Sequence, residues 1–328
     1  MGLGIRGIGL ALPATKVTAE ELAASSGVPL AFFRKNLRLR EKPVAREQHP
    51  LDLALEAIGD LQRQAPFEPS SIDLIVYAST GLTDYLFWSP AAKVQATIGA
   101  TNAYCFEVSN ACNSLNLALH VVEGLMATTP SYRRALIVCA DTLSRYVDHA
   151  DPESRSILNF ADAASALLCD RDAPRLRLVR TVLATDSAYV DAYRLSWGGS
   201  RALGSVNARQ SIQYTRVEHP ESLHDQYTRH ITSLVERLLH ETNLGREDID
   251  FLFMNQGDHR LVTETLGRFG LREEQSCSSY ETHGHLGTTD IAFALRRGLD
   301  RGLFEPDANI IAVSSAVGFS WGASLFKF

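Results

Sequence analysis

Short apolar runs separated by longer amphipathic stretches organise this chain. Continuous runs of mainly apolar residues are typical of buried strands, and they fall at residues 73–79, 135–140, 251–254 and 309–314. Apolar residues spaced three or four apart predict helices, and this spacing occurs at residues 51–62, 112–126, 223–239 and 287–298. Because strands alternate with helices, the pattern favours an α/β fold whose central sheets are covered on both faces.

Two of these predicted strands recur at an almost constant distance along the chain. The sequence SIDLIV at 71–76 resembles DIDFLF at 248–253, at an offset of 177 residues. The sequence IVCA at 137–140 resembles IAVS at 311–314, at an offset of 174. The shared offset predicts two similar halves, because repeated units recur at a fixed period. The two expected halves are residues 1–170 and 171–328.

Composition and charge narrow the class of protein. The 328 residues are 45% hydrophobic and 21% charged, an ordinary globular balance that excludes disorder, collagen and coiled coil. A formal net charge of −6 argues against nonspecific nucleic-acid binding. The five cysteines are scattered without a CxxC pair, which argues against a disulfide framework or zinc site and favours a reducing compartment. No apolar run reaches membrane-spanning length, so we expect a cytoplasmic protein that binds neither membrane nor metal.

One cysteine stands at the expected start of a helix. Cys112 follows an apolar strand pattern and a turn of small residues, and an apolar helix pattern follows it. Backbone N–H groups and the helix dipole stabilise a thiolate there, and the same N–H groups can hold the oxyanion of a tetrahedral thioester intermediate. A buried structural role is the commoner one for a free cysteine. We expect that role for Cys105, Cys139, Cys169 and Cys277, while for Cys112 placement alone leaves both roles open.

Five motifs spread along the chain resemble those of the ketoacyl-acyl-carrier-protein synthase III group of the thiolase superfamily. They are GIRGIG at 4–9, FWSPAAKVQ at 87–95, the Ala-Cys turn at 111–112, FADAASA at 160–166 and GFSWGASL at 318–325. The last is close to the family sequence GFTWGAAL. The resemblance extends over nearly the whole chain. It implies the thiolase fold, an α/β fold of two pseudo-symmetric halves with central mixed sheets in a layered αβαβα arrangement.

The resemblance implies that Cys112 is the acylated nucleophile, and it reveals an exchange in the other two catalytic positions. The family carries a histidine in a PHQAN motif and an asparagine in an HGN motif, whereas these positions here are Asn255 and His285. Cys112 and His285 are 173 residues apart, close to the offset between the halves, so we expect them to begin equivalent helices that converge. That would give the Cys–His arrangement that activates a thiol, with Asn255 as a neutral hydrogen-bond donor.

A carboxylate follows the exchanged histidine by about one helical turn. Asp290 lies five residues after His285 and can orient its imidazole, as the acid of a Ser/Cys-His-Asp triad does. A capping or surface carboxylate is the alternative. The sequence leaves both roles open.

Backbone donors and substrate-binding residues follow from the same resemblance. The oxyanion would be held by the N–H groups of Cys112 and Val317, and Gly318 would lie beside the substrate at the end of the family's glycine-rich run. Phe32 resembles the aromatic residue that clasps the adenine of CoA. The arginine that accompanies it in the family is Asn36 here, which favours a carrier-protein thioester over CoA as the acyl donor.

Surface residues of two kinds are expected to meet other proteins. Phe87 lies in the segment that resembles the family's dimer interface, and its ring would reach the acyl tunnel of the neighbouring subunit of a homodimer. Arg260 matches a family residue that meets the acidic helix of the carrier protein, and Arg268 could extend it into a basic strip. A solvated helix face is an equal alternative for the two arginines.

The exchanged pair decides between the functions that we expect. The leading interpretation is an enzyme that forms an acyl-Cys thioester and transfers the acyl group from an acyl carrier protein or acyl-CoA to a small-molecule acceptor. It would serve polyketide, fatty-acid or related secondary metabolism, without a cofactor. One alternative is a decarboxylative β-ketoacyl-acyl-carrier-protein synthase III that condenses the acyl group with a malonyl thioester. Another is a catalytically inactive partner subunit, against which the retention of Cys112 argues.

Overall fold

The structure, a computed structural model, describes residues 2–204 and 211–328 of the chain. Its α-helices are α1 (Ala19–Ser26), α2 (Pro50–Gln64), α3 (Pro90–Ile98), α4 (Ser114–Thr128), α5 (Leu223–Thr242), α6 (His259–Arg268), α7 (Tyr280–His283) and α8 (Asp290–Asp300). Its strands are β1 (Gly4–Ala11), β2 (Lys16–Thr18), β3 (Glu41–Pro43), β4 (Leu74–Ser79), β5 (Tyr104–Ser109), β6 (Arg134–Thr142), β7 (Asp162–Asp170), β8 (Arg177–Thr185), β9 (Tyr193–Leu195), β10 (Ile212–Tyr214), β11 (Phe251–Met254), β12 (Asn309–Ala316) and β13 (Ser320–Lys327). The four predicted apolar strands are β4, β6, β11 and β12.

The strand order repeats along the main sheet. Within the described residues the sheet has nine strands in the order β11-β12-β13-β8-β1-β7-β6-β4-β5. In the first half β4 runs parallel to β6, which is followed by antiparallel β7 and β1. In the second half β11 runs parallel to β12, which is followed by antiparallel β13 and β8. The strands related by the sequence repeat therefore hold equivalent places, and the predicted boundary at 170/171 falls between β7 and β8.

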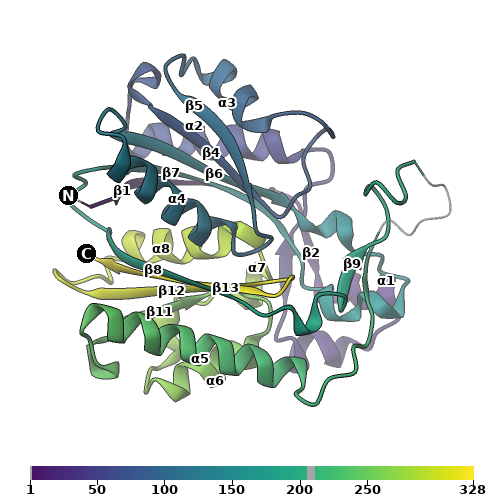
Figure 1. The fold of residues 1–328 in the computed structure, drawn as a ribbon. Helices are drawn as coiled ribbons and strands as arrows, with labels where there is room; N and C mark the ends of the chain where they lie inside the picture. The colour runs from purple at the N-terminus through teal and green to yellow at the C-terminus, as the bar shows by residue number, and fades with distance from the viewer. Residues whose placement is uncertain (1, 205–210) are drawn as a thin grey trace.

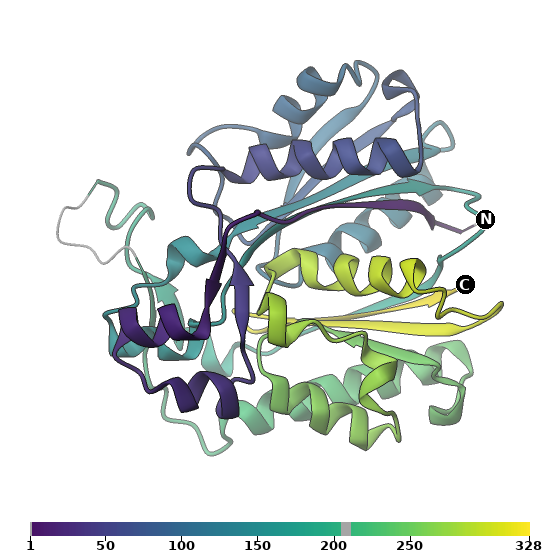
Figure 2. The same cartoon turned by 180° about the vertical axis from the view of Figure 1, so that it is seen from behind.

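The two halves of this sheet face each other with helices between them. Within the described residues they are joined at one corner, where β1 and β8 share the pair Gly4–Arg177. Figures 1 and 2 show α4 and α8 between the two half-sheets, α2 and α3 on the outer face of the first, and α5 and α6 on the outer face of the second. This arrangement confirms the layered αβαβα thiolase fold with mixed sheets.

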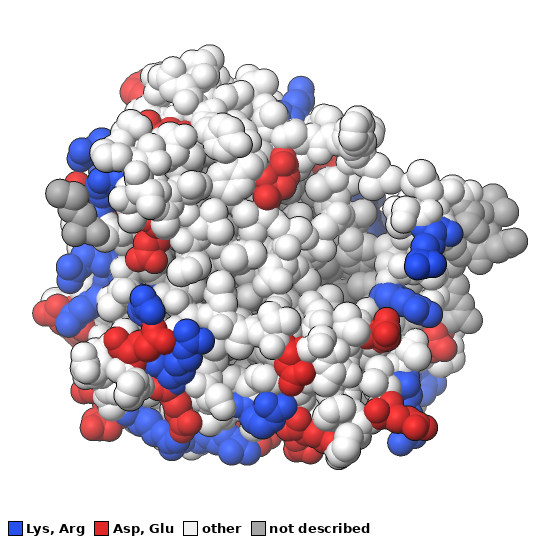
Figure 3. Space-filling view, in the orientation of Figure 1, with Lys and Arg blue, Asp and Glu red and all other residues white. Residues whose placement is uncertain are grey.

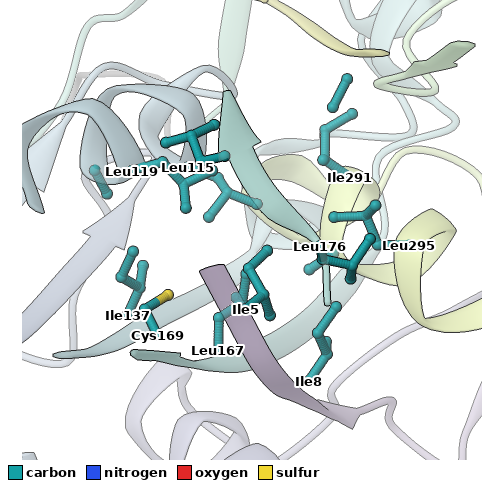
Figure 4. Close-up of a cluster of buried hydrophobic side chains, with 14 of the residues drawn as sticks. Ile5, Ile8, Leu115, Leu119, Ile137, Leu167, Cys169, Leu176, Ile291 and Leu295 are labelled. Carbon is teal, nitrogen blue, oxygen red and sulfur yellow. The ribbon is translucent and has the colours of Figure 1, made fainter. Parts of the chain in front are cut away.

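The middle layer is held by apolar side chains from both halves. Leu115 and Leu119 on α4 and Ile291 and Leu295 on α8 are buried against strand residues such as Ile137 (Figure 4). Burying one such side chain stabilises the fold by roughly 1.5–3 kcal/mol. Because both helices are anchored on the same core, their N-terminal ends are brought to one place between the half-sheets.

Both central helices begin later than the sequence pattern predicts. The expected helix at 112–126 starts at Ser114, because Asn113 has a non-helical backbone with φ −92° and ψ 3° and is the N-cap. The expected helix at 287–298 starts at Asp290, after a 3-10 turn over Gly287–Thr289. Cys112 therefore lies in a turn ahead of its helix. No helix in the described ranges is long and apolar enough to cross a membrane.

Candidate active site

Cys112 lies in a tight turn between β5 and α4. The left-handed Ala111 reverses the chain just ahead of the thiol. The Ser114 hydroxyl lies 2.7 Å from the carbonyl oxygen of Ala111 and 2.9 Å from that of Ser79, and it accepts the N–H of Asn110 at 2.7 Å. These bonds fix the turn, while Cys112 stays partly exposed and open to an incoming substrate.

His285 reaches the same place from the second half, and it is almost fully buried. Its backbone N–H donates to the carbonyl of Asn159 at 3.0 Å, and its carbonyl accepts the N–H of Ala161 at 2.9 Å. The ring of Phe160 meets its imidazole edge-on at 5.3 Å between centroids. The imidazole Nε2 lies 3.2 Å from Sγ of Cys112. The geometry therefore brings the predicted Cys–His pair into hydrogen-bonding contact.

Asp290 lies on the other side of the imidazole. Its Oδ2 is 2.5 Å from Nδ1 of His285 and also accepts the backbone N–H of Gln256 at 2.8 Å. Its Oδ1 accepts the backbone N–H of Leu286 at 3.0 Å. The side chain is buried at the first residue of α8, where the helix dipole favours a negative charge. Of the two roles left open by the sequence, the geometry matches the one that orients the imidazole.

The electrostatics of this row of three side chains favour a charged imidazole. Burial by itself would lower the pKa of His285, but the neighbouring charges of Cys112 and Asp290, with their hydrogen bonds, outweigh it and raise that pKa well above its ordinary value. An imidazolium then faces the sulfur, held on its far side by Asp290. A Cys–His–Asp row of this kind can generate a nucleophilic sulfur and carry a proton to or from a bound group.

The other four cysteines lie in environments that suppress thiolate formation. Burial raises the pKa of Cys139 to about 12. The same cause raises the pKa of Cys105, Cys169 and Cys277. Their contrast with Cys112, which has an imidazole at 3.2 Å, singles it out as the candidate nucleophile.

Asn255 lies at the end of β11, close to fully buried, and bonds to the end of β12. Its Nδ2 donates to the carbonyl of Ser315 at 3.0 Å, and its Oδ1 accepts the N–H and the hydroxyl of Ser315 at 3.0 and 3.2 Å. The amide oxygen and one of the two amide N–H groups are thus bound to Ser315. The expected role of Asn255 as a donor to the reacting group stays a prediction that these contacts do not favour.

The turn between β12 and β13 carries the expected second oxyanion donor. Val317 is exposed there, and Gly318 has a φ of 137°, which L side chains rarely adopt. The Ser320 hydroxyl, which follows the turn, donates to Oδ1 of Asn110 at 3.0 Å. That bond connects the β12–β13 turn to the loop that carries Cys112, because Asn110 lies two residues before the cysteine.

Of the residues expected to bind partners, Phe87 lies on the surface and Phe32 is half-buried against a core cluster. Phe87 is fully exposed, beside the exposed Tyr85 and Leu86. Phe32 begins a short π-helix at Phe32–Asn36 and packs edge-on against Phe33.

The expected basic strip on α6 is partly neutralised. Arg260 pairs with Asp258 at 3.5 Å, and Arg268 pairs with Glu264 at 2.8 Å. Figure 3 shows positive and negative side chains interleaved along the edge formed by α5 and α6. The geometry thus resembles the alternative of a solvated helix face more than a strip of one charge.

Several residues that support the site were missed from the sequence. Asn159 and Phe160 hold the backbone and ring of His285, and Gln256 supports Asp290. The only sequence signal for the first two was the FADAASA motif, which Phe160 begins and Asn159 directly precedes. Within residues 2–204 and 211–328, no three His, Cys, Asp or Glu side chains are grouped as metal ligands.

Comparison with known proteins reports the same family over both halves. A family model described as 3-oxoacyl-[acyl-carrier-protein (ACP)] synthase III matches residues 106–187, and the model of its C-terminal part matches residues 239–328. The chain is 28% identical to the beta-ketoacyl-[acyl-carrier-protein] synthase III of Thermosynechococcus vestitus, covering 99% of this chain and 98% of the relative. It is 27% identical to the enzyme of that name from Prochlorococcus marinus, over 99% of this chain and 96% of the relative.

Solved structures share the fold over the whole chain. The 3-oxoacyl-(acyl carrier protein) synthase III, FabH, of Pseudomonas aeruginosa superimposes with a TM-score of 0.89 at 22% identity, covering 100% of this chain and 98% of that one. OleA of Xanthomonas campestris superimposes with a TM-score of 0.85 at 15% identity, covering 100% of this chain and 99% of that one. At these identities the likeness establishes the fold.

Proposed function

Because the chain belongs to the 3-oxoacyl-[acyl-carrier-protein] synthase III family of the thiolase superfamily and is an acyl-transferring enzyme, we propose that it acylates itself on Cys112 and passes the acyl group to a nucleophilic acceptor. The donor is a thioester of an acyl carrier protein, with acyl-CoA as the alternative. The acceptor is a small molecule with a free hydroxyl, amine or thiol. The setting that we propose is polyketide- or fatty-acid-type secondary metabolism.

The row Asp290–His285–Cys112 is the observation that carries this proposal. In the first step the sulfur of Cys112 attacks the thioester carbonyl, and the tetrahedral intermediate collapses by breaking the bond to the carrier's sulfur. The departing thiolate takes the proton from Nε2 of His285, 3.2 Å from Sγ in the free enzyme. The imidazole is left neutral, and Asp290 keeps Nδ1 protonated and the ring in place.

The second step uses the neutral imidazole as a base. Acylation removes the negative charge of Cys112, one of the causes that raise the pKa of His285, so the ring can accept a proton while Asp290 stabilises the resulting cation. The acceptor gives its proton to Nε2 as its oxygen, nitrogen or sulfur attacks the acyl carbonyl. The bond to Sγ breaks, and the Cys112 thiolate and the imidazolium are restored together.

Decarboxylative condensation is the alternative function, favoured by the names of the related enzymes. That reaction forms an enolate, which needs hydrogen-bond donors that are free to bind it. One of the two N–H groups of the Asn255 amide and its oxygen are bonded to Ser315, which leaves at most one N–H for an enolate, while His285 is equipped with a carboxylate for proton transfer. These contacts favour transfer. They also favour an active enzyme over an inactive partner subunit.

The deciding experiment measures two products from the same enzyme. Incubation with an acyl-carrier thioester followed by intact mass reports the adduct on Cys112, and CO₂ release from a malonyl-carrier thioester reports decarboxylation. We expect an adduct, its discharge by an added nucleophile, and little CO₂. Efficient decarboxylation of the malonyl donor would replace the transferase proposal with the condensing one, and no adduct with any donor would favour an inactive subunit.

Reinstating the family order of the two residues sharpens this test. The double variant Asn255→His with His285→Asn keeps both side-chain types but removes the imidazole that contacts Asp290. We expect it to fold and to lose transfer, and a gain of CO₂ release would indicate that the exchange separates the two reactions. A double variant that transfers as fast as the wild type would contradict the role given to His285.

We also propose that the enzyme is a homodimer. Tyr85 and Leu86 are 68% and 66% exposed beside the fully exposed Phe87, a cluster of apolar surface that a lone subunit would leave in water. Sedimentation at micromolar concentration is expected to give a dimer, and Phe87→Ser is expected to weaken it. A stable wild-type monomer would overturn this proposal.

A further inference from the structure

Lys42, on the short strand β3, is a buried charged residue that the proposed mechanism does not use. None of its surface is exposed, which is rare for lysine. Its Nζ donates to the carbonyl of Leu158 at 2.8 Å and to that of Phe160 at 2.6 Å. A buried cation requires such partners, because burial without them is strongly unfavourable. The lysine is therefore fitted to this one segment of backbone.

The segment that Lys42 holds is the one that holds His285. Its carbonyls alternate in direction, so those of residues 158 and 160 face Lys42 while that of Asn159 accepts the N–H of His285 at 3.0 Å. The N–H of Ala161 then donates to the carbonyl of His285 at 2.9 Å, in a parallel bridge between the two segments. Lys42 and His285 thus lie on opposite sides of one short stretch of chain.

The same segment also supports the carboxylate end of the row. The side-chain Nδ2 of Asn159 donates to the carbonyls of Gln256 and Gly257 at 3.3 and 2.9 Å, and the N–H of Gln256 donates to Asp290. The packing here is close, since a Cβ on Gly284 would lie 2.3 Å from the carbonyl oxygen of Asn159. A shift of this segment would therefore move both the imidazole and its carboxylate.

We propose that Lys42 is a positioning residue, whose ammonium fixes the backbone at residues 158–161 and thereby keeps His285 in contact with Cys112. The inference rests on the proposed role of His285. A displacement of about 1 Å at a reacting group can cost on the order of 10² in rate, so loss of this clamp has a measurable effect.

The charges around Lys42 give the clamp a pH dependence. Burial lowers the pKa of Lys42 to about 8, and the buried carboxylate of Asp162 opposes that shift. His149 is the other titratable group within range of this charge, because burial and then the charge of Lys42 lower the pKa of that ring. Asp162 is itself held by the N–H groups of Ala45 and Ser144. As pH rises through about 8, Lys42 loses its charge and its two hydrogen bonds weaken.

Two variants and a matched control test the proposal. Lys42→Met removes the donors, Lys42→Arg keeps a cation that does not titrate in this range, and Lys16→Met removes an exposed lysine that pairs with Glu41 beside β3. The first readout is alkylation of Cys112 by iodoacetamide, which needs an aligned imidazolium but no acyl substrate. The second is the rate of acyl transfer from the preformed adduct as a function of pH.

We expect Lys42→Met to slow alkylation at pH 7 by roughly tenfold and transfer by roughly 10–10², with an unchanged KM for the donor. Lys42→Arg is expected to stay within a few-fold of wild type at pH 7 and to lack the decline that wild type shows as pH rises through about 8. Lys16→Met should match wild type in both assays.

The outcomes separate this inference from the proposed function. Wild-type alkylation and transfer rates in Lys42→Met would overturn the positioning role. If Lys42→Met does not fold, Lys42→Arg decides alone, and an alkaline decline identical to that of wild type would overturn it. If the wild type transfers no acyl group at all, the proposed function fails, while the alkylation rates still report whether Lys42 positions His285.

Discussion

The two turns that meet at the active site are built in opposite ways. The turn of Cys112 is partly exposed, and its sharp reversal comes from Ala111, a residue that bears a left-handed backbone without being glycine. The turn of His285 is buried and flanked by Gly284 and Gly287, with φ values of 62° and 63°. The nucleophile is thus reachable from outside, and the histidine is enclosed.

This difference follows from what each side chain has to do. A nucleophile has to meet a thioester that arrives on another molecule, so its surroundings have to stay open. A base works only when its ring keeps one orientation and one tautomer, so His285 is bonded through its backbone and through Nδ1. The turns of Cys112 and His285 hold equivalent places in the two halves. The turn of Cys112 is partly exposed, whereas the turn of His285 is buried and held by hydrogen bonds.

The largest expected effect comes from removing the thiol of Cys112, the partly exposed member of the Cys112–His285 pair. Cys112→Ala is expected to abolish the acyl adduct and leave the fold intact, because burial suppresses ionisation of the other thiols. Intact mass after incubation with an acyl-carrier thioester is the measurement. Cys105→Ala, on the adjoining strand β5, is the matched control and should acylate normally. An adduct on the Cys112→Ala protein would show that the nucleophile lies elsewhere.

Removing the buried imidazole of His285 should slow acyl transfer without abolishing it. His285→Ala is expected to reduce transfer roughly 10²–10⁴-fold, the usual range for a general base. His283→Ala is the control, because that ring bonds Thr282 and packs on Phe293, outside the row. Single-turnover transfer from the preformed adduct is the measurement, and an equal loss in the two variants would mean that the effect is structural.

Replacing the carboxylate of Asp290 removes the negative charge beside the buried imidazole of His285. In Asp290→Asn the amide NH₂ cannot accept, so one of the donors now bonded to the carboxylate loses its partner. We expect transfer to fall by as much as about 10⁴-fold, because the amide no longer holds the tautomer of His285 that keeps Nε2 free to act as a base.

The pH dependence of the transfer rate in Asp290→Asn tests whether Asp290 raises the pKa of His285. Loss of the negative charge lowers the pKa of His285, because Asp290 is one of the causes that raise it. The ring then becomes neutral at a lower pH, so the acidic limb of the transfer rate should move down in pH. A limb that stays in place would mean that Asp290 does not set the protonation of His285.

The sequence predicted part of the elements of the fold, those whose signals are local. Apolar runs predicted β4, β6, β11 and β12, and the offsets of 177 and 174 residues paired strands that do hold equivalent places in the sheet. The starts of α4 and α8 were placed too early. The non-helical backbone at Asn113 and the 3-10 turn before Asp290 depend on tertiary contacts that leave no local pattern.

The site was only partly predictable for a related reason. The repeat offset pointed to a meeting of Cys112 and His285, but the role of Asp290 stayed open because it depends on where α8 begins. The contacts of Asn159 and Lys42 join segments far apart in sequence, through backbone carbonyls that any residue carries. No pattern of side chains could therefore reveal them.

A smaller effect is expected where the sequence suggested a catalytic role. Asn255→Ala removes bonds between β11 and β12, and a neutral hydrogen bond contributes about 1 kcal/mol to the free energy of unfolding, so stability should fall, while transfer should fall by about tenfold or less because no step of the proposed mechanism uses Asn255. Ser315→Ala is the comparison, since it removes only the hydroxyl partner. Transfer rates beside thermal unfolding are the measurement. A loss of transfer far beyond tenfold at unchanged stability would assign Asn255 a direct part in binding the oxyanion.

The smallest expected effect comes from changing the backbone of the turn that carries Cys112. It tests whether this turn tolerates more backbone flexibility than the turn that carries His285. Ala111→Gly relieves a left-handed alanine, worth roughly 1–2 kcal/mol, but adds backbone freedom to the unfolded chain, worth roughly 0.5–1 kcal/mol. The free energy of unfolding should rise by about 1 kcal/mol or less, and transfer should change only a few-fold, because Ser114 still fixes the turn.

The reverse change, Gly284→Ala, forces a Cβ against the carbonyl of Asn159 and should cost roughly 1–3 kcal/mol of folding stability. Thermal unfolding and transfer rates of the two variants make the comparison. If Ala111→Gly lowers transfer as much as Gly284→Ala does, the nucleophile needs the same rigidity as the histidine, and the difference between the two turns has no catalytic meaning.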